Sequence, residues 1–167
     1  MKLRSVGLFL ETVLFTIVVP GTVTVLIPSL ILGRDGRSFA GPWSPIPFVA
    51  LVLLSFGAAV YFRCLWEFAA RGRGIPLPID HPKSLVVTGL YRYVRNPMYV
   101  GVLILLLGEV LMFRSAGLLV YTLCWFAFVH LNVVLWEERL LRHKFGDSYL
   151  RYRASVRRWI PGKRYEG

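Results

Sequence analysis

The fold is decided by residues 116–138, which read AGLLVYTLCWFAFVHLNVVLWEE. No formally charged residue lies between Leu118 and Trp136, and two adjacent carboxylates, Glu137 and Glu138, end the run. A helix needs about 20 mainly apolar residues to cross a hydrocarbon layer of ~30 Å. This stretch therefore predicts a transmembrane helix that carries a pair of acids at one membrane face.

The composition of the whole chain is that of a membrane protein. Its 167 residues are 56% hydrophobic and their mean hydropathy is +0.58, which is too apolar for a soluble domain of this size. Further apolar stretches at 6–32, 45–68 and 97–113 are read as spans, the last being short. We therefore predict an all-α integral membrane fold, one domain over 1–167. It has about four transmembrane helices, followed by amphipathic cytoplasmic helices at the C-terminus.

The basic residues predict the orientation and the partners. With four spans, the positive charges near the N-terminus, those in the 69–96 loop and nine more after residue 135 fall on one side, against only Arg34, Arg37 and Arg114 on the other. The positive-inside rule then places both termini in the cytoplasm, as in a bacterial inner membrane. The net charge of the chain is +11, and its basic residues flank the predicted membrane helices. We therefore expect membrane lipids rather than nucleic acid as partners. Cys64 and Cys124 lack metal-ligand spacing, and we predict no metal site.

The last two spans should form an antiparallel hairpin, because only residues 114–115 connect them. Counting outward from this turn at helical rise places His130 at the depth of Met98-Tyr99. The same count places the acid pair Glu137-Glu138 at the depth of Tyr91-Arg92. The hairpin thus predicts a polar site at one cytoplasmic rim.

Asn96-Pro97 is typical of a helix start, because Asn is a favoured N-cap and Pro is tolerated at the first helical position. The free N–H groups of such a start attract anions. Structural alternatives stay open: Asn96 could only cap the helix, His130 could be an interhelical polar contact, and the two acids could only pair with Arg92 or Arg95.

The chain after residue 138 alternates basic and apolar residues. Gly146 is expected to end one amphipathic helix, and Asp147 can cap the next. Aromatic and apolar residues then repeat at helical spacing up to Pro161, which predicts an interfacial helix on the headgroups: Tyr149, Tyr152, Val156 and Trp159.

Three motifs in order carry a family resemblance. They are G-x-Y-x-x-x-R-N-P-x-Y-x-G at 89–101, the acid pair at 137–138, and F-G-x-x-Y-x-x-Y-x-x-x-V-x-R-x-x-P at 145–161. Together with G-R-G-I-P-L-P at 72–78, they resemble the isoprenylcysteine carboxyl methyltransferase and phospholipid methyltransferase family of membrane enzymes. The resemblance covers about 70–161, which we take as a cofactor-binding region, and residues 1–69 are predicted to form an N-terminal helical hairpin.

The resemblance implies methyl transfer from S-adenosylmethionine to a lipid-like or small apolar acceptor, such as an isoprenylcysteine carboxylate or a phospholipid amine. It implies that the following residues line the cofactor site: Gly89, Tyr91, Asn96, Pro97, Tyr99, Gly101, His130, Glu137 and Glu138. Arg95, Glu138 and Arg92 are the residues predicted to act in catalysis. An arginine can orient a carboxylate acceptor, whereas an amine or a thiol needs a base, for which Glu137, Glu138 and His130 are the candidates.

Two other functions remain as alternatives at this point. Sterol reductases, which depend on NADPH, look distantly similar in the C-terminal region, although this chain is short for one. A non-catalytic membrane protein would use the same acids and arginines as structural pairs. The sequence names neither a protein partner nor the acceptor.

Overall fold

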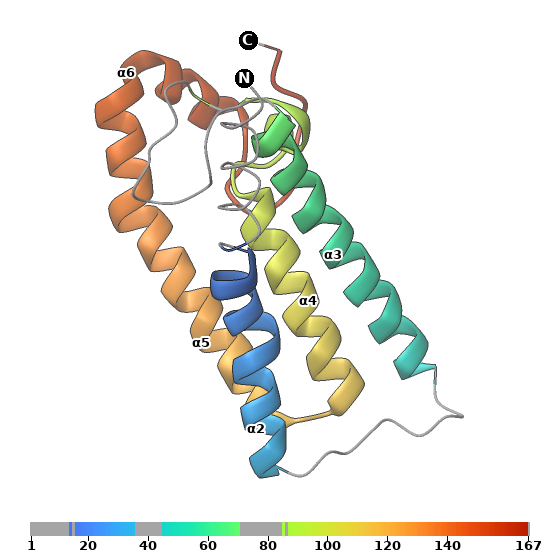
Figure 1. The fold of residues 1–167 in the computed structure, drawn as a ribbon. Coiled ribbons are helices and arrows are strands. Elements are labelled where there is room, and N and C mark those ends of the chain that lie inside the picture. Colours follow the sequence, from blue (N-terminus) through green and yellow to red (C-terminus); the bar gives the residue numbers. More distant parts are fainter. Residues whose placement is uncertain (1–13, 15, 36–44, 71–84, 86, 167) are drawn as a thin grey trace.

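The structure is a computed structural model that describes residues 14, 16–35, 45–70, 85 and 87–166. Long helical rods dominate the described part of the chain (Figure 1). In chain order, the helical elements of the described residues are the π-helix η1 (Thr22–Leu26), α2 (Ile27–Asp35), α3 (Ile46–Ala70), the 3-10 helix η2 (Gly89–Arg92), α4 (Pro97–Phe113), α5 (Ala116–Asn132), the π-helix η3 (Val133–Glu137) and α6 (Glu138–Ser155). The prediction of an all-α fold is confirmed.

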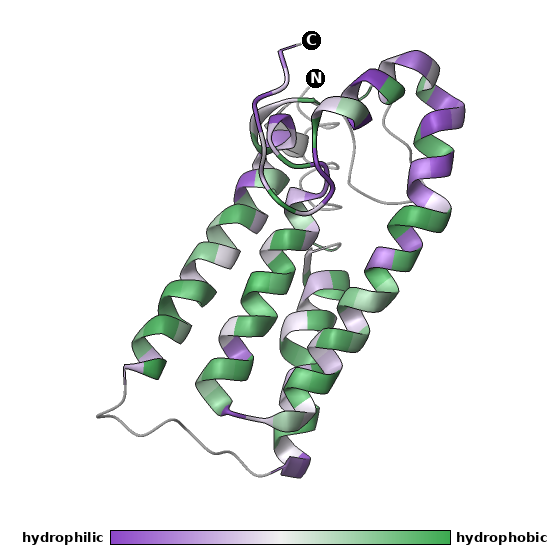
Figure 2. Cartoon of the chain, turned by 180° about the vertical axis from the view of Figure 1, so that it is seen from behind, coloured by the Kyte–Doolittle hydropathy of each residue, from purple (hydrophilic) through white to green (hydrophobic). Residues whose placement is uncertain are grey.

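The rods have the length and apolarity of membrane helices. Three continuous helices, Thr16–Asp35, Ile46–Glu67 and Ala116–Ser155, are long and apolar enough to cross a bilayer, and α4 is a shorter apolar helix. Figure 2 shows hydrophobic residues along the rods and hydrophilic ones concentrated in α6 and the C-terminal segment. The chain is therefore an integral membrane protein, and α4 has the bounds predicted for the short third span. Residues 6–13 of the first predicted span and the 72–78 segment lie outside the described residues.

Glycines bring α3 and α4 into close contact. A Cβ on Gly57 of α3 would lie 2.8 Å from the carbonyl oxygen of Gly101 and 2.8 Å from the backbone nitrogen of Leu105, both on α4. About two turns further along α4, a Cβ on Gly108 would lie 2.9 Å from Cγ of Leu54 on α3. Small residues let membrane helices approach backbone to backbone, where close packing supplies much of the attraction. This contact fixes α4 against α3.

The connection between α4 and α5 is the predicted tight turn. Arg114 adopts the left-handed conformation (φ 51°) and its N–H bonds to the carbonyl of Val110, which closes α4. Ser115 then caps α5, because its hydroxyl accepts the N–H of Leu118 at 3.1 Å. The same hydroxyl donates to Asp35 Oδ2 at 2.7 Å, which ties the end of α2 to this turn.

The first rod contacts both α3 and α5 in the described residues, and the hydroxyl of Tyr61 on α3 donates to Thr16 Oγ1 at 3.3 Å. α2 packs against α5, and α3 packs against α4. Tyr121 of α5 donates to the carbonyl of Val23 at 2.9 Å, where the π-turn of η1 interrupts the regular bonding of the first rod. The division of the chain at residues 69 and 70 stays a prediction.

The chain after α6 does not continue as the expected interfacial helix. α6 bends at Gly146 (φ 49°, ψ −127°), as predicted, but the helix ends at Ser155 and Val156 is extended. The chain then pairs with the segment before α4: the N–H of Arg95 bonds to the carbonyl of Arg157 at 2.9 Å, and Tyr93 accepts the N–H of Gly162. Burial explains the difference, because Tyr149, Tyr152 and Val156 form a small core with Leu85 and Val87 instead of facing headgroups.

Candidate functional site

Glu138 is the centre of a charged network at one end of the bundle. Its carboxylate accepts from Arg158 Nε at 2.6 Å and Nη2 at 3.1 Å, and from Arg95 Nη1 at 2.8 Å. Arg153 Nε lies 3.8 Å away. The Glu138 side chain is only 7% exposed, and its hydrogen bond raises the pKa of the Arg158 guanidinium above its usual value. Three guanidinium groups around one carboxylate leave a surplus of positive charge.

A π-turn decides which of the two acids faces this network. Val133 and Glu138 are five residues apart, at opposite ends of η3, and both are buried. A regular α-helix would have placed Glu137 nearer to the face of Val133 and His130. The π-turn adds one residue to the turn, so Glu138 points inward and Glu137 lies beside it.

Glu137 contacts α4 instead. The hydroxyl of Tyr99 donates to Glu137 Oε1 at 2.6 Å. The depth count predicts the acid pair beside Tyr91-Arg92, whereas the two acids contact Tyr99 and Arg95. The reason is that residues before Pro97 do not extend α4 but form the 3-10 turn η2 and a loop.

Asn96 precedes α4 without capping it through its side chain. Its Nδ2 donates to the carbonyl of Arg158 at 3.2 Å, and no side-chain bond to the first turn of α4 exists. The helix boundary predicted from Asn96-Pro97 is confirmed, whereas side-chain capping is not. The first N–H groups of α4 are left without this partner.

His130 is held by a residue from the C-terminal segment. Trp159 Nε1 donates to His130 Nδ1 at 3.0 Å, and Phe126 packs against both rings. Because Nδ1 accepts a hydrogen bond, the neutral ring carries its proton on Nε2. His130 therefore presents a donor rather than a base on its other side.

The remaining predicted residues lie apart from the network. Gly101 and Pro97 are buried in the bundle, and the close α3–α4 contact accounts for a glycine at 101. The carbonyl of Tyr91 accepts the hydroxyl of Tyr152 at 2.6 Å. Gly89 and Arg92 line a separate cavity with Glu67.

Sequence reasoning missed the arginines that neutralise Glu138. Arg153 and Arg158 had been placed on an interfacial helix, and only the motif ending at Pro161 singled out position 158. Helical periodicity could not reveal that the chain folds back after Ser155. Tyr149 was also missed as a site residue, although its hydroxyl lies 3.4 Å from Arg95 Nη1.

Comparison with known proteins identifies the family of the chain. Residues 46–148, more than half of the chain, match the sequence model of the phospholipid methyltransferase family. The chain belongs to this family. The family match includes α3, so it begins inside the region that we predicted as an N-terminal hairpin, and it ends before the Trp159 and Arg158 contacts.

Two curated relatives have more specific names. Over 83 residues the chain is 40% identical to a protein-S-isoprenylcysteine O-methyltransferase of Schizosaccharomyces pombe, covering 49% of this chain and 34% of that protein. Over 75 residues it is 33% identical to methanethiol S-methyltransferase 1 of Bradyrhizobium diazoefficiens, covering 45% of this chain and 25% of that protein. The matches thus span about a third and a quarter of these relatives. No solved structure matches.

Proposed function

We propose that this protein transfers a methyl group from S-adenosylmethionine to a lipid-like or small apolar acceptor at the cytoplasmic membrane face. The observation that carries the proposal is the network of Arg95, Glu138 and Arg158 beside the first turn of α4, in a chain of the phospholipid methyltransferase family. The names of both relatives describe methyl transfer, to an isoprenylcysteine and to a thiol.

The residues present fit the carboxylate of the methyl donor. Arg95 Nε is buried and has no hydrogen-bond partner among the described residues. The first turn of α4 lacks a side-chain cap at Asn96, so its N–H groups and the positive end of the helix dipole are available to an anion. The surplus positive charge around Glu138 also favours binding of an anion. Arg95 and this helix start would hold the carboxylate.

Other groups suit the rest of the donor. One oxygen of Glu137 accepts from Tyr99, and its second oxygen can accept from an ammonium group or a ribose hydroxyl. Aromatic rings at Tyr99 and Trp159 are suited to an adenine or to the positive sulfonium. Glu138 acts through Arg95 and is therefore a positioning residue.

The donor supplies an activated methyl group when it is bound, and the protein supplies position and charge. Holding two reactants in line can account for effective molarities of ~10⁵–10⁸ M. A carboxylate acceptor needs no base. For an amine or a thiol acceptor, Glu138 is occupied by guanidinium groups and His130 Nδ1 by Trp159. Glu137 is then the remaining candidate base, and in that case its second oxygen faces the acceptor instead of the donor.

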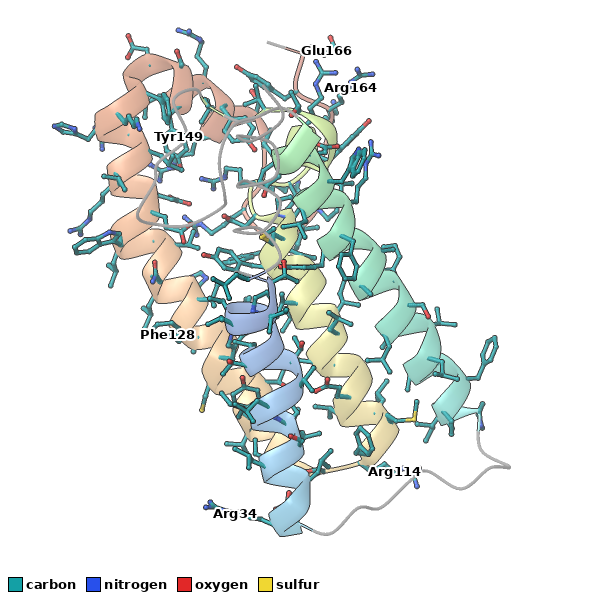
Figure 3. The ribbon with its side chains drawn as sticks, in the orientation of Figure 1. Arg34, Arg114, Phe128, Tyr149, Arg164 and Glu166 are labelled. Atoms are coloured by element: carbon teal, nitrogen blue, oxygen red, sulfur yellow. The ribbon has the colours of Figure 1, made fainter. Side chains whose placement is uncertain are left out.

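The orientation is part of the proposal. Figure 3 shows Arg34 and Arg114 at one end of the bundle and Tyr149, Arg164 and Glu166 at the other. Because basic residues are concentrated at the second end, the positive-inside rule favours a cytoplasmic location for it. A lipid acceptor would then reach the site from the membrane, and the donor from the cytosol.

The test is methyl transfer by the protein reconstituted in lipid vesicles, with a radiolabelled donor. A prenylated cysteine, phosphatidylethanolamine and an alkanethiol are offered separately as acceptors. Label in one of these acceptors is expected, and Arg95→Gln should abolish it while Arg142→Gln, an exposed arginine of α6, should not. Absence of label from all three, with donor binding demonstrated, would contradict the proposed acceptor class.

A further inference from the structure

The end of α3 meets the segment that leads to Arg95 through a contact between Glu67 and Gly89. Glu67 lies in the last turn of α3, and its side chain is only 5% exposed. Gly89 is the first residue of η2. A Cβ built on Gly89 would overlap the carboxylate of Glu67. The carboxylate therefore occupies the space in which a side chain at position 89 would lie.

The backbone of Gly89 explains why this position is a glycine. Its φ is 55°, in the left-handed region that glycine enters without strain. The chain passes at this point from the extended Thr88 into the 3-10 turn. The missing side chain thus permits both the start of η2 and the close approach of Glu67. In the motif G-x-Y-x-x-x-R-N-P, the glycine at position 89 has a conformational role.

The contact between Glu67 and Gly89 is steric rather than polar. Neither carboxylate oxygen of Glu67 accepts a hydrogen bond within the described part of the chain. Arg63 Nε forms an ion pair with Oε1 at 3.4 Å, but the Arg63 side chain is 61% exposed, and ion pairs with an exposed partner contribute little to stability. The shape of the Glu67 side chain therefore matters more for this contact than its charge does.

The segment that begins at Gly89 is held from the other side by the C-terminal part of the chain. The carbonyl of Tyr91 accepts the hydroxyl of Tyr152 at 2.6 Å, and the N–H of Arg95 bonds to the carbonyl of Arg157 at 2.9 Å. Glu67 adds a contact from a membrane-spanning helix at the start of this segment. The direction of the segment, and of the Arg95 guanidinium at its end, thus depends on α3 as well.

We propose that Glu67 is a positioning residue of the methyl-transfer site and acts through Gly89 and η2 on Arg95. This inference rests on the proposed function, in which Arg95 holds the carboxylate of the methyl donor. Among the described residues, no hydrogen bond or ion pair joins Glu67 to Arg95, so the effect travels along the backbone. Glu67 fixes where η2 begins, and this sets where the guanidinium lies relative to the first turn of α4.

Substitutions that keep or remove the shape of Glu67 test the proposal. Donor affinity of the purified full chain in neutral detergent is measured by titration calorimetry. Glu67→Gln keeps the contact with Gly89 and should leave the affinity unchanged, as should Arg63→Gln, which removes only the ion pair. Glu67→Ala removes the contact and Gly89→Ala forces a Cβ into it. Because a small misplacement of a binding group is costly, each should weaken donor binding at least about tenfold.

Two double variants trace the path of the effect. Gly89→Ala carries backbone strain in any background, but after Glu67→Ala the new Cβ no longer meets a carboxylate. Gly89→Ala should therefore weaken donor binding less in the Glu67→Ala background than in the parent. In the Arg95→Gln background, Glu67→Ala should have no further effect, because no guanidinium is left to position.

A thermal scan of every variant separates folding from positioning, and affinities are compared where all variants are folded. Should Gly89→Ala fail to fold, the variants of Glu67 and Arg95 decide alone. Unchanged donor affinity in Glu67→Ala, an affinity in Glu67→Gln as weak as in Glu67→Ala, or additive effects of Glu67→Ala and Arg95→Gln would each overturn the positioning role. A folded parent protein that binds no methyl donor would overturn the proposed function as well.

Discussion

Arg158 Nε lies 2.6 Å from Glu138 Oε1, and this contact joins the C-terminal segment to the first residue of α6. Arg95, in the segment just before α4, contacts the same oxygen at 2.8 Å. The carboxylate of Glu138 therefore joins three parts of the chain: the C-terminal segment, α6 and the segment before α4. The contact has two consequences. It holds the C-terminal segment over the end of the bundle, and it fixes the direction of the Arg95 guanidinium.

The first prediction concerns the carboxylate of Glu138. Glu138→Gln leaves three guanidinium groups facing one another without an anion, and breaking a buried pair costs about 3–5 kcal/mol. We expect a clear fall in the melting temperature of the detergent-solubilised protein. Glu166→Gln, at an exposed acid, is the control and should have no effect. A melting temperature equal to that of the parent would show that the network contributes little to folding.

The second prediction separates binding from folding at Glu137. The carboxylate of Glu137 is proposed to accept a hydrogen bond from the methyl donor, and a charge-assisted hydrogen bond contributes about 1.5–3 kcal/mol. Glu137→Gln should therefore weaken donor binding about 10–100-fold with little change in melting temperature. Titration calorimetry measures the first quantity and a thermal scan the second. Donor affinity that survives this substitution would remove Glu137 from the site.

The third prediction concerns the contact between α3 and α4. In Gly57→Ala, the new Cβ would lie 2.8 Å from two backbone atoms of α4, which cannot move without separating the helices. Overpacking of this kind costs about 1–3 kcal/mol, so the melting temperature should fall. Gly33→Ala is the matched control, since a Cβ there meets nothing within 4 Å and alanine favours a helix. Equal behaviour of the two variants would argue against the close contact.

The fourth prediction concerns Trp159. Trp159→Phe keeps a ring beside Phe126 but removes the N–H that bonds to His130. The loss of one hydrogen bond should cost about 1 kcal/mol, and His130 Nδ1 becomes free to take a proton. NMR of the His130 ring should therefore show a mixture of tautomers in place of the Nε2–H form. An unchanged ring spectrum would mean that Trp159 does not set the tautomer.

Much of the fold could be predicted from hydropathy and turn chemistry. The apolar runs mark the membrane helices, Asn96-Pro97 marks the start of α4, and residues 114–115 mark the hairpin. These features are local, and each is determined by a few neighbouring residues. The bend at Gly146 is another local feature that could be predicted from the sequence.

The site was less predictable because its contacts join distant parts of the chain. Helical periodicity predicts an interfacial helix from Asp147 to Pro161 and cannot show that burial of Tyr149 and Tyr152 turns the chain back toward Arg95. The π-turn before Glu138 gives no clear sequence signal either, yet it selects which acid is buried. Glu67 was overlooked because a single acid at the end of an apolar run is normally read as an interfacial charge.

Binding of S-adenosylmethionine to the purified, folded protein should be measured by titration calorimetry, with NADPH as the control ligand. We expect saturable binding of the methyl donor, weakened in Arg95→Gln and in Glu137→Gln, and no binding of NADPH. Binding of NADPH alone would favour a reductase. Failure of a folded protein to bind either ligand would contradict the cofactor site and leave the charged network as a structural feature.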